Sequence, residues 1–104
     1  MARFDVYENT NPATRREIPF LLDVQADLLD GLASRVVAPL VRAEAMGKPA
    51  QRLNPTFRID HIEVVMSTAE LAGVPKMVLG NKVGSLARHQ DEIVAALDFL
   101  FTGY

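Results

Sequence analysis

Short segments of alternating apolar and polar residues, separated by turn-forming residues, constrain the fold of this chain most. Alternation with a period of two is typical of strands that bury one face. The expected strands cover residues 4–7, 20–24, 35–41, 56–59, 62–66 and 74–80. Asp60 and His61 separate two of these segments and favour a tight hairpin. Five to seven short strands at spacings of about 8 to 20 residues, closed by one helix, predict a small antiparallel barrel or sandwich with a helix on it.

Pro39 and Thr68 carry further expectations about this sheet. Pro39 has no amide hydrogen to donate to a neighbouring strand, so it predicts that the strand at 35–41 lies at a sheet edge or contains a bulge. Thr68 begins the segment 68–73, which is expected to form a single helical turn with Thr68 as its cap.

Leu28 and Leu29 lie in the segment 25–31, which is expected to be a turn after the second strand. Adjacent side chains on an extended chain point to opposite faces, so the two leucines cannot both face the core. At least one is expected to be exposed, and an exposed leucine beside acidic residues suits a contact surface.

The C-terminal stretch from Gly84 to Gly103 predicts an amphipathic helix. When residues are placed about 100° apart, its apolar side chains fall in one stripe. The stripe consists of Leu86, Ile93, Leu97 and Leu100. Ser85 is the expected N-cap, and Gly103 is the expected left-handed residue that ends the helix. Phe99 falls on the polar side of the helix, where its ring is exposed to solvent unless a partner covers it. This exposure weakly indicates an interface. The alternative is a singly exposed aromatic residue without a role.

Length, charge and cysteine content narrow the class of protein. The 104 residues fit one domain, residues 1–104, whose modest core oligomerisation would help to stabilise. The absence of cysteine excludes disulfides and thiolate metal sites. A net charge of -2 lacks the basic excess typical of direct nucleic-acid binding. No apolar run reaches the roughly 18 residues of a membrane span, so no membrane association and a cytoplasmic location are expected.

The residues that could carry chemistry form no catalytic or metal-binding pattern. His61 and His89 have no partner at a ligand or triad spacing, and each is expected to be a solvated surface histidine. Asp23, Asp27 and Asp30 recur every three or four positions, which would align them for a cation on a helix. Their segment is expected to be a strand followed by a turn, so hydrogen bonding within turns is favoured. The sequence therefore indicates a binding protein without cofactor or metal rather than an enzyme.

Several stretches, in one order along nearly the whole chain, resemble the CcdB toxins of bacterial toxin–antitoxin modules. The specific parts are Asp23-Val24-Gln25-Ala26-Asp27 and Gly73-Val74-Pro75. The other matching stretches are Phe4-x-Val6-Tyr7, Leu28-Leu29-Asp30, Arg35-Val36-Val37-x-Pro39-Leu40, Leu53-Asn54-Pro55, Thr68-Ala69-Glu70-Leu71-Ala72, Leu79-Gly80, and the final helix with Phe101 and Gly103.

The resemblance implies a mostly β fold, a small SH3-like barrel of antiparallel strands of the CcdB/MazF type with one C-terminal α-helix. It also implies a homodimer with two-fold symmetry. Proteins of this family bind the DNA gyrase A subunit and trap the complex in which gyrase has cleaved DNA. A cognate CcdA-like antitoxin, whose C-terminal segment is flexible, wraps and neutralises the toxin. These activities are not enzymatic.

The gyrase contact of the family can be carried over residue by residue. Its two aliphatic residues after the second strand match Leu28 and Leu29, and an asparagine on the helix corresponds to Asp98. Its closing Phe-Trp-Gly-Ile corresponds to Phe101-Thr102-Gly103-Tyr104, so Thr102 replaces a tryptophan that stacks on a gyrase arginine. Three other polar helix residues of the family are replaced by Gln90, Val94 and Ala95. Tyr104 returns an aromatic ring two residues later, and we hypothesise that it compensates in part.

Three readings of this resemblance remain open at the level of sequence. The first is a gyrase poison with an altered contact, and the second is a homologue that dimerises and binds antitoxin but has lost gyrase or acts on another target. The third is a MazF-type ribonuclease, for which Arg15, Arg16 and Arg35 could be nominated although nothing in the sequence pairs them. For the antitoxin, Arg15, Arg16, Arg42 and Arg52 are candidates to meet an acidic disordered peptide, and solvated loop charges are the alternative.

Overall fold

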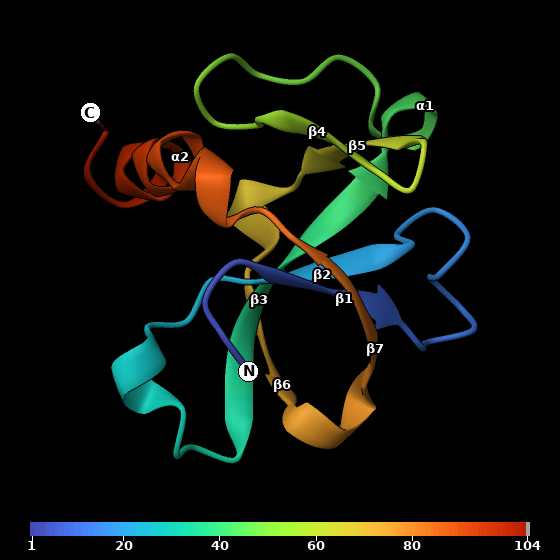
Figure 1. The fold of residues 1–104 in the computed structure, drawn as a ribbon. Helices are drawn as coiled ribbons and strands as arrows, with labels where there is room; N and C mark the ends of the chain where they lie inside the picture. The colour runs from blue at the N-terminus through green and yellow to red at the C-terminus, as the bar shows by residue number, and fades with distance from the viewer. Residues whose placement is uncertain (104) are drawn as a thin grey trace.

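A computed structural model describes residues 1–103 and shows one curled antiparallel sheet with a helix at its C-terminal end (Figure 1). Within these residues the strands are β1 (Asp5–Asn9), β2 (Phe20–Asp23), β3 (Ser34–Arg42), β4 (Thr56–Ile59), β5 (Ile62–Met66), β6 (Ala72–Pro75) and β7 (Leu79–Ser85). The helices are α1 (Ala43–Met46) and α2 (Gln90–Thr102). Four 3-10 turns are η1 (Asp27–Leu29), η2 (Thr68–Glu70), η3 (Lys76–Val78) and η4 (Ala87–His89).

The strand order is β4-β5-β3-β2-β1-β7, and β6 pairs with β3 beside β5. All of these pairs are antiparallel. A half-barrel is formed by β6, β3, β2, β1 and β7, in that order around the sheet (Figure 1). The turn η3 connects β6 to β7, the first and last strands of this series. This architecture confirms the expected mostly β fold with one C-terminal helix.

One face of the sheet carries the hydrophobic core. The alternation expected from the sequence places Val6, Leu22 and Leu40 on neighbouring strands of this face, all fully buried. Ile93 of α2 and Leu86 before it pack against the same cluster. The helix therefore covers the face of the sheet that carries the hydrophobic core.

The tight hairpin between β4 and β5 is confirmed. Ile59 pairs with Ile62, which leaves Asp60 and His61 as a two-residue turn. Both turn residues have positive φ, 48° and 67°, as the preferred two-residue hairpin turn requires.

The expectation that Pro39 marks a sheet edge or a bulge is wrong, because the register of β3 with its partner strands is regular. β3 is a central strand that pairs with β2 on one side and with β5 and β6 on the other. On that second side β5 pairs with β3 from Leu40 onward, and β6 pairs with it only as far as Val37. Pro39 thus lies between two partner strands, where its missing donor interrupts no strand ladder.

The end of the chain also differs from expectation. The single strand expected over 74–80 is divided into β6 and β7 by η3, and β7 continues to Ser85. The helix consequently begins at Gln90, and Ser85 does not cap it; the Ser85 Oγ accepts from the Ala87 amide, 3.1 Å away, at the start of η4. Gly103 ends the helix in the left-handed conformation, with φ 80°, as expected.

The helical turn expected after residue 67 is present as η2, but Thr68 is not its cap. Thr68 is the first residue of the turn and is fully buried. Its hydroxyl donates to the Leu53 carbonyl, so it ties η2 to the preceding loop instead. None of the helices in the described part of the chain has the length and apolar character that a membrane span requires.

Candidate functional site

The turn that carries Leu28 and Leu29 presents both side chains to solvent. Leu28 is 97% exposed and Leu29 is 49% exposed. The exposure expected for at least one of them is therefore found for both. An isolated leucine in solvent is common, but two at the tip of one 3-10 turn form a compact apolar surface.

A buried arginine holds this turn against the sheet. The side chains of Arg35 and Asp23 are both 0% exposed, and the Arg35 Nη2 lies 2.5 Å from the Asp23 Oδ2. The Arg35 Nε donates to the same oxygen at 2.9 Å, and its Nη1 reaches Asp30 Oδ1 at 3.0 Å. Asp30 directly follows η1, so one guanidinium links β2, β3 and the leucine turn.

The electrostatics of Asp23 follow from its position. Burial raises the pKa of the Asp23 carboxyl above its usual range, and the hydrogen bonds from Arg35 and the Gln25 amide act in the opposite direction. An unpaired carboxylate here would be costly, so the three hydrogen bonds that Asp23 accepts keep a charged pair in the interior.

Gln25 also holds the turn that carries Leu28 and Leu29. Its Nε2 donates to the Leu29 carbonyl at 3.1 Å, and its Oε1 accepts from the Val36 amide at 2.9 Å. Gln25 is itself buried. The backbone under Leu28 is therefore held by buried polar groups, and an apolar contact presented on a fixed backbone loses little entropy when a partner binds.

The N-terminal segment connects the leucine turn to the segment that leads into the helix. The Arg3 amide donates to Asp27 Oδ1 in η1 at 2.7 Å. One residue later, the Phe4 carbonyl accepts from the Leu86 amide at 2.8 Å. In Figure 1 η1 and the end of α2 lie on the same side of the molecule.

The end of α2 carries the other residues expected at the gyrase contact. Asp98 is exposed, and Phe101 is 72% exposed. The Thr102 hydroxyl donates to the Asp98 carbonyl at 2.7 Å, and the Gly103 amide donates to the Phe99 carbonyl. Gln90 and Ala95 are exposed, and Val94 is half-buried. Tyr104 lies outside the described residues.

Phe99 is covered within the chain, which corrects the expectation of a wet ring. The Arg52 guanidinium lies over the Phe99 ring, 4.6 Å from its centroid, and Phe99 is half-buried. A cation over an aromatic face is an attractive arrangement. Phe99 consequently gives no indication of an interface by itself.

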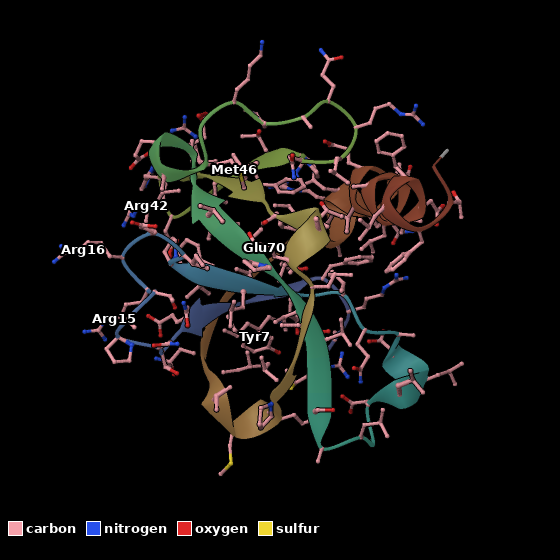
Figure 2. The ribbon with its side chains drawn as sticks, turned by 180° about the vertical axis from the view of Figure 1, so that it is seen from behind. Tyr7, Arg15, Arg16, Arg42, Met46 and Glu70 are labelled. Carbon is pink, nitrogen blue, oxygen red and sulfur yellow. The ribbon has the colours of Figure 1, made fainter. Side chains whose placement is uncertain are left out.

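The four arginines expected to meet the antitoxin fall into two groups. Arg15, Arg16 and Arg42 lie near one another on the side away from α2 (Figure 2). The Arg42 Nε donates to the Arg16 carbonyl at 2.9 Å, which ties the end of β3 to the loop between β1 and β2. Arg52, stacked on Phe99, is separate from this group and close to α2.

The residues considered for catalysis or metal binding have structural roles. Asp23, Asp27 and Asp30 accept hydrogen bonds in and around the turn, as expected. His61 is exposed in its hairpin as expected, but His89 is half-buried against the Phe57 ring, whose centroid is 5.3 Å away. Within residues 1–103, no group of three acidic or histidine side chains could hold a metal ion.

Arg35, nominated for a ribonuclease, has no exposed surface and is paired with Asp23. No pattern in the sequence indicates this pair. The register supplies it, because Asp23 pairs with Val37 and Arg35 lies two residues away on the same face of β3.

These features define a small, mostly β protein in which a curled antiparallel half-barrel carries a helix on its core face. The sequence model of the family described as CcdB protein matches residues 3–103. The chain therefore belongs to the CcdB family. Membership of this family indicates the toxin of a toxin–antitoxin pair.

Proposed function

We propose that this chain is a toxin that binds the DNA gyrase A subunit as a homodimer and traps the gyrase–DNA cleavage complex. A cognate CcdA-like antitoxin neutralises it, and the toxin acts in the cytoplasm as one domain spanning residues 1–104. The proposed gyrase-binding residues are Leu28, Leu29, Asp98, Phe101, Thr102, Gly103 and Tyr104. The proposed antitoxin-binding residues are Arg15, Arg16, Arg42 and Arg52.

The observation that carries this proposal is the exposure of Leu28 on a turn held by buried polar groups. Its side chain makes almost no contact within the chain, yet Arg35 and Gln25 hold the surrounding backbone. Phe101, in the last turn of α2, adds a second exposed apolar side chain. The end of α2 and η1 lie on the same side of the molecule (Figure 1). Exposed apolar side chains that gather on one side of a protein are typical of protein interaction sites.

Thr102 favours a gyrase contact that differs from the one usual in the family. The hydroxyl of Thr102 donates back to the helix, and its side chain has no ring to stack on a guanidinium. Loss of a central aromatic anchor typically costs about 2 kcal/mol, or a factor of about 30 in affinity. This supports a toxin matched to the gyrase of its own host. It equally supports the second candidate function, a homologue that binds antitoxin but has another target.

Expression in the host separates these two functions. A gyrase poison is expected to stop growth, and overexpression of the host gyrase A subunit is expected to restore it. Leu28→Glu should abolish toxicity, whereas Met77→Glu, at a residue that is 89% exposed on η3, should leave it intact. Toxicity that persists in the Leu28→Glu variant, or that the gyrase A subunit does not relieve, would point to another target.

A further inference from the structure

The loop between α1 and β4 presents Arg52 on a strained but fixed backbone. Arg52 has a φ of 71°, in the left-handed region that residues other than glycine rarely adopt. The Asn54 Nδ2 donates to the Met66 carbonyl at 3.0 Å, and the Thr68 hydroxyl donates to the Leu53 carbonyl. These two bonds tie the loop to β5 and η2 directly after the strained residue. Strain that the surrounding structure maintains in this way is an indication of function.

The guanidinium of Arg52 is positioned against α2 with its donors unused. It lies 4.6 Å from the centroid of the Phe99 ring, and the residue is exposed. Within residues 1–103 no hydrogen bond or ion pair engages this guanidinium. A guanidinium carries five N–H donors in a planar fork that matches the two oxygens of a carboxylate. Arg52 is therefore prepared to bind a carboxylate that a partner supplies.

A cleft of about 250 Å³ lies between this loop and α2 and is lined by Arg52, Pro55, Glu92 and Ala95. Pro55 and Ala95 make part of its lining apolar, while Arg52 and Glu92 bring opposite charges to it. The cleft is smaller than the pockets of roughly 300–1,000 Å³ that enclose small-molecule ligands. It therefore suits a single side chain from a protein partner, held beside the Arg52 guanidinium.

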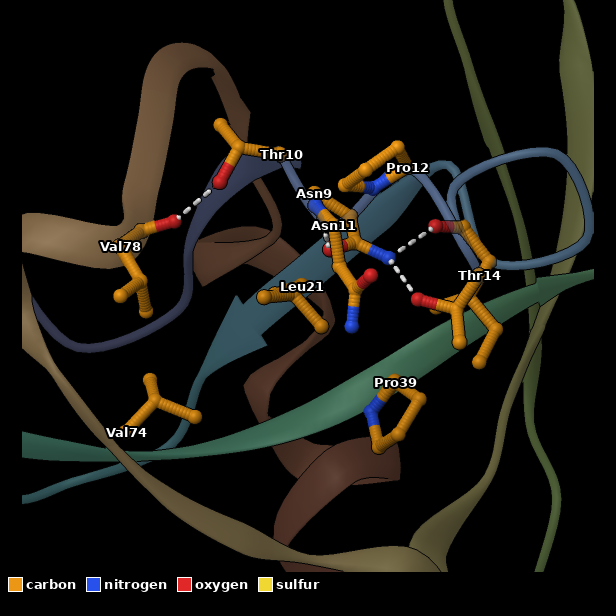
Figure 3. Close-up of a pocket in the computed structure, with 10 residues that line it drawn as sticks. Asn9, Thr10, Asn11, Pro12, Thr14, Leu21, Pro39, Val74 and Val78 are labelled. Carbon is orange, nitrogen blue, oxygen red and sulfur yellow. Dashed lines mark hydrogen bonds between the residues drawn. The ribbon is translucent and has the colours of Figure 1, made fainter.

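A larger cavity, of about 450 Å³, differs from this cleft in its chemistry. Leu21, Pro39, Val74 and Val78 give it an apolar wall (Figure 3). None of the residues that line it is charged, so the lining has no formal charge with which to select a carboxylate. Because charged groups that meet across an interface determine which partner fits, the cleft beside α2 is the better place to look for partner selection.

The cleft continues the face of α2 on which the proposed gyrase contact lies. Ala95 of the cleft and Thr102 of that contact are seven residues apart, about two helical turns, so they lie on one face of the helix. Asp98 lies between them, three residues after Ala95, and all three residues are exposed. Seven residues span about 10 Å along a helix, which is short compared with a typical protein interface. A partner that covers Asp98 and Thr102 thus reaches Arg52 next.

We propose that Arg52 determines which gyrase this chain binds, by pairing with a carboxylate of the gyrase A subunit in the cleft against α2. Contact with Phe99 holds the guanidinium in place, so little side-chain entropy is lost when the pair forms. A gyrase without an acidic residue at the matching position would leave Arg52 covered and unpaired, which disfavours that partner. The inference rests on the proposed function and gives Arg52 a role in addition to the antitoxin contact proposed above.

Calorimetric titration of the full-length chain with the purified host gyrase A subunit, at low and at high salt, tests this proposal. Arg52→Met keeps a long apolar side chain over Phe99 and removes the charge, so affinity should fall about tenfold or more. The affinity of the parent should also decrease more steeply with salt than that of Arg52→Met, which a merely structural role of Arg52 would not produce. Arg58→Met is the matched control, because Arg58 is an exposed arginine on β4, and it should bind like the parent.

Arg52→Lys is a second variant, which keeps the charge without the planar fork and should bind more tightly than Arg52→Met but less tightly than the parent. If the parent binds gyrase and Arg52→Met binds equally well, the inference about Arg52 is overturned and the gyrase function stands. A parent that does not bind the host gyrase A subunit overturns both. Sedimentation of the variants alone should match that of the parent. Dissociation into single chains on loss of the Arg52 charge would assign this residue to a contact between two copies and overturn the inference.

Discussion

Arg35 and Asp23 face each other with both side chains fully buried, and the Arg35 Nη2 lies 2.5 Å from the Asp23 Oδ2. The same guanidinium reaches Asp30 at the end of the leucine turn. The buried ion pair between β2 and β3 is thereby connected to the turn that presents Leu28. Stability is expected to depend on Arg35 because it pairs with the buried Asp23, and partner binding because it reaches Asp30 beside the turn that presents Leu28.

Arg35→Ala should lower the free energy of unfolding by about 3 to 5 kcal/mol, because it leaves the Asp23 carboxylate buried without a partner. Urea denaturation followed by circular dichroism measures this loss. Arg58→Ala is the control, since Arg58 is an exposed arginine on a strand of the same sheet and its removal should change the value by less than about 0.5 kcal/mol. Similar small losses for the two variants would contradict the role of the buried pair.

Titration of Tyr7 is expected to lower the free energy of unfolding at high pH. Its hydroxyl donates to Asp5 Oδ2 at 3.2 Å, and burial together with the Asp5 charge raises its pKa from 10.0 to about 12. Between these values the unfolded chain releases a proton that the folded chain keeps. The free energy of unfolding should therefore be unaffected by this group below pH 10 and fall by about 2 to 3 kcal/mol as the pH rises to 12.

Denaturation curves of the parent and of Tyr7→Phe, recorded from pH 9 to 12, check this expectation. The parent should lose more stability over this range than Tyr7→Phe, which has no phenol to titrate at this position. Parallel pH profiles for the two proteins would show that Tyr7 titrates alike in the folded and unfolded states.

Leu28→Glu should separate binding from folding. The side chain is 97% exposed, so its replacement should change the free energy of unfolding by no more than about 0.5 kcal/mol. On the proposed function, affinity for the gyrase A subunit should fall at least tenfold, measured by isothermal titration calorimetry. Unchanged affinity in a folded variant would remove Leu28 from the contact.

Thr102→Trp should restore the aromatic anchor usual in the family. A central aromatic contact is worth about 2 kcal/mol, so affinity for an enterobacterial gyrase A subunit should rise by a factor of about 30. Thr102→Val is the control, because it removes the hydroxyl that bonds to the Asp98 carbonyl without adding a ring. An equal response of the two variants would show that the ring is not what the contact lacks.

Local sequence signals were sufficient where one segment determines its own structure. Asp60 and His61 predicted the hairpin because the two-residue turn fixes the pairing of its flanking strands. Gly103 predicted the end of the helix because glycine adopts positive φ without strain. The adjacent Leu28 and Leu29 predicted that at least one would be exposed, because neighbouring side chains on an extended chain point to opposite faces.

Long-range relations explain the failures. Pro39 was expected at a sheet edge or a bulge, but it lies where β5 and β6 leave a gap along β3, and only the register of three strands reveals that gap. Phe99 was expected to be wet, but Arg52 from a distant loop covers its ring. The pairing of Arg35 with Asp23 likewise depends on the register between β2 and β3. None of these relations leaves a pattern in the sequence close to the residue concerned.

A DNA-cleavage assay with purified protein and gyrase tests the central claim most directly. The chain is incubated with supercoiled DNA and either the host gyrase or an enterobacterial one, beside the Leu28→Glu and Met77→Glu variants. We expect linear DNA to accumulate with the host enzyme for the parent and Met77→Glu, and not for Leu28→Glu. No cleavage with either enzyme, from a protein shown to be a folded dimer, would contradict gyrase poisoning and favour a homologue that keeps the antitoxin but has another target.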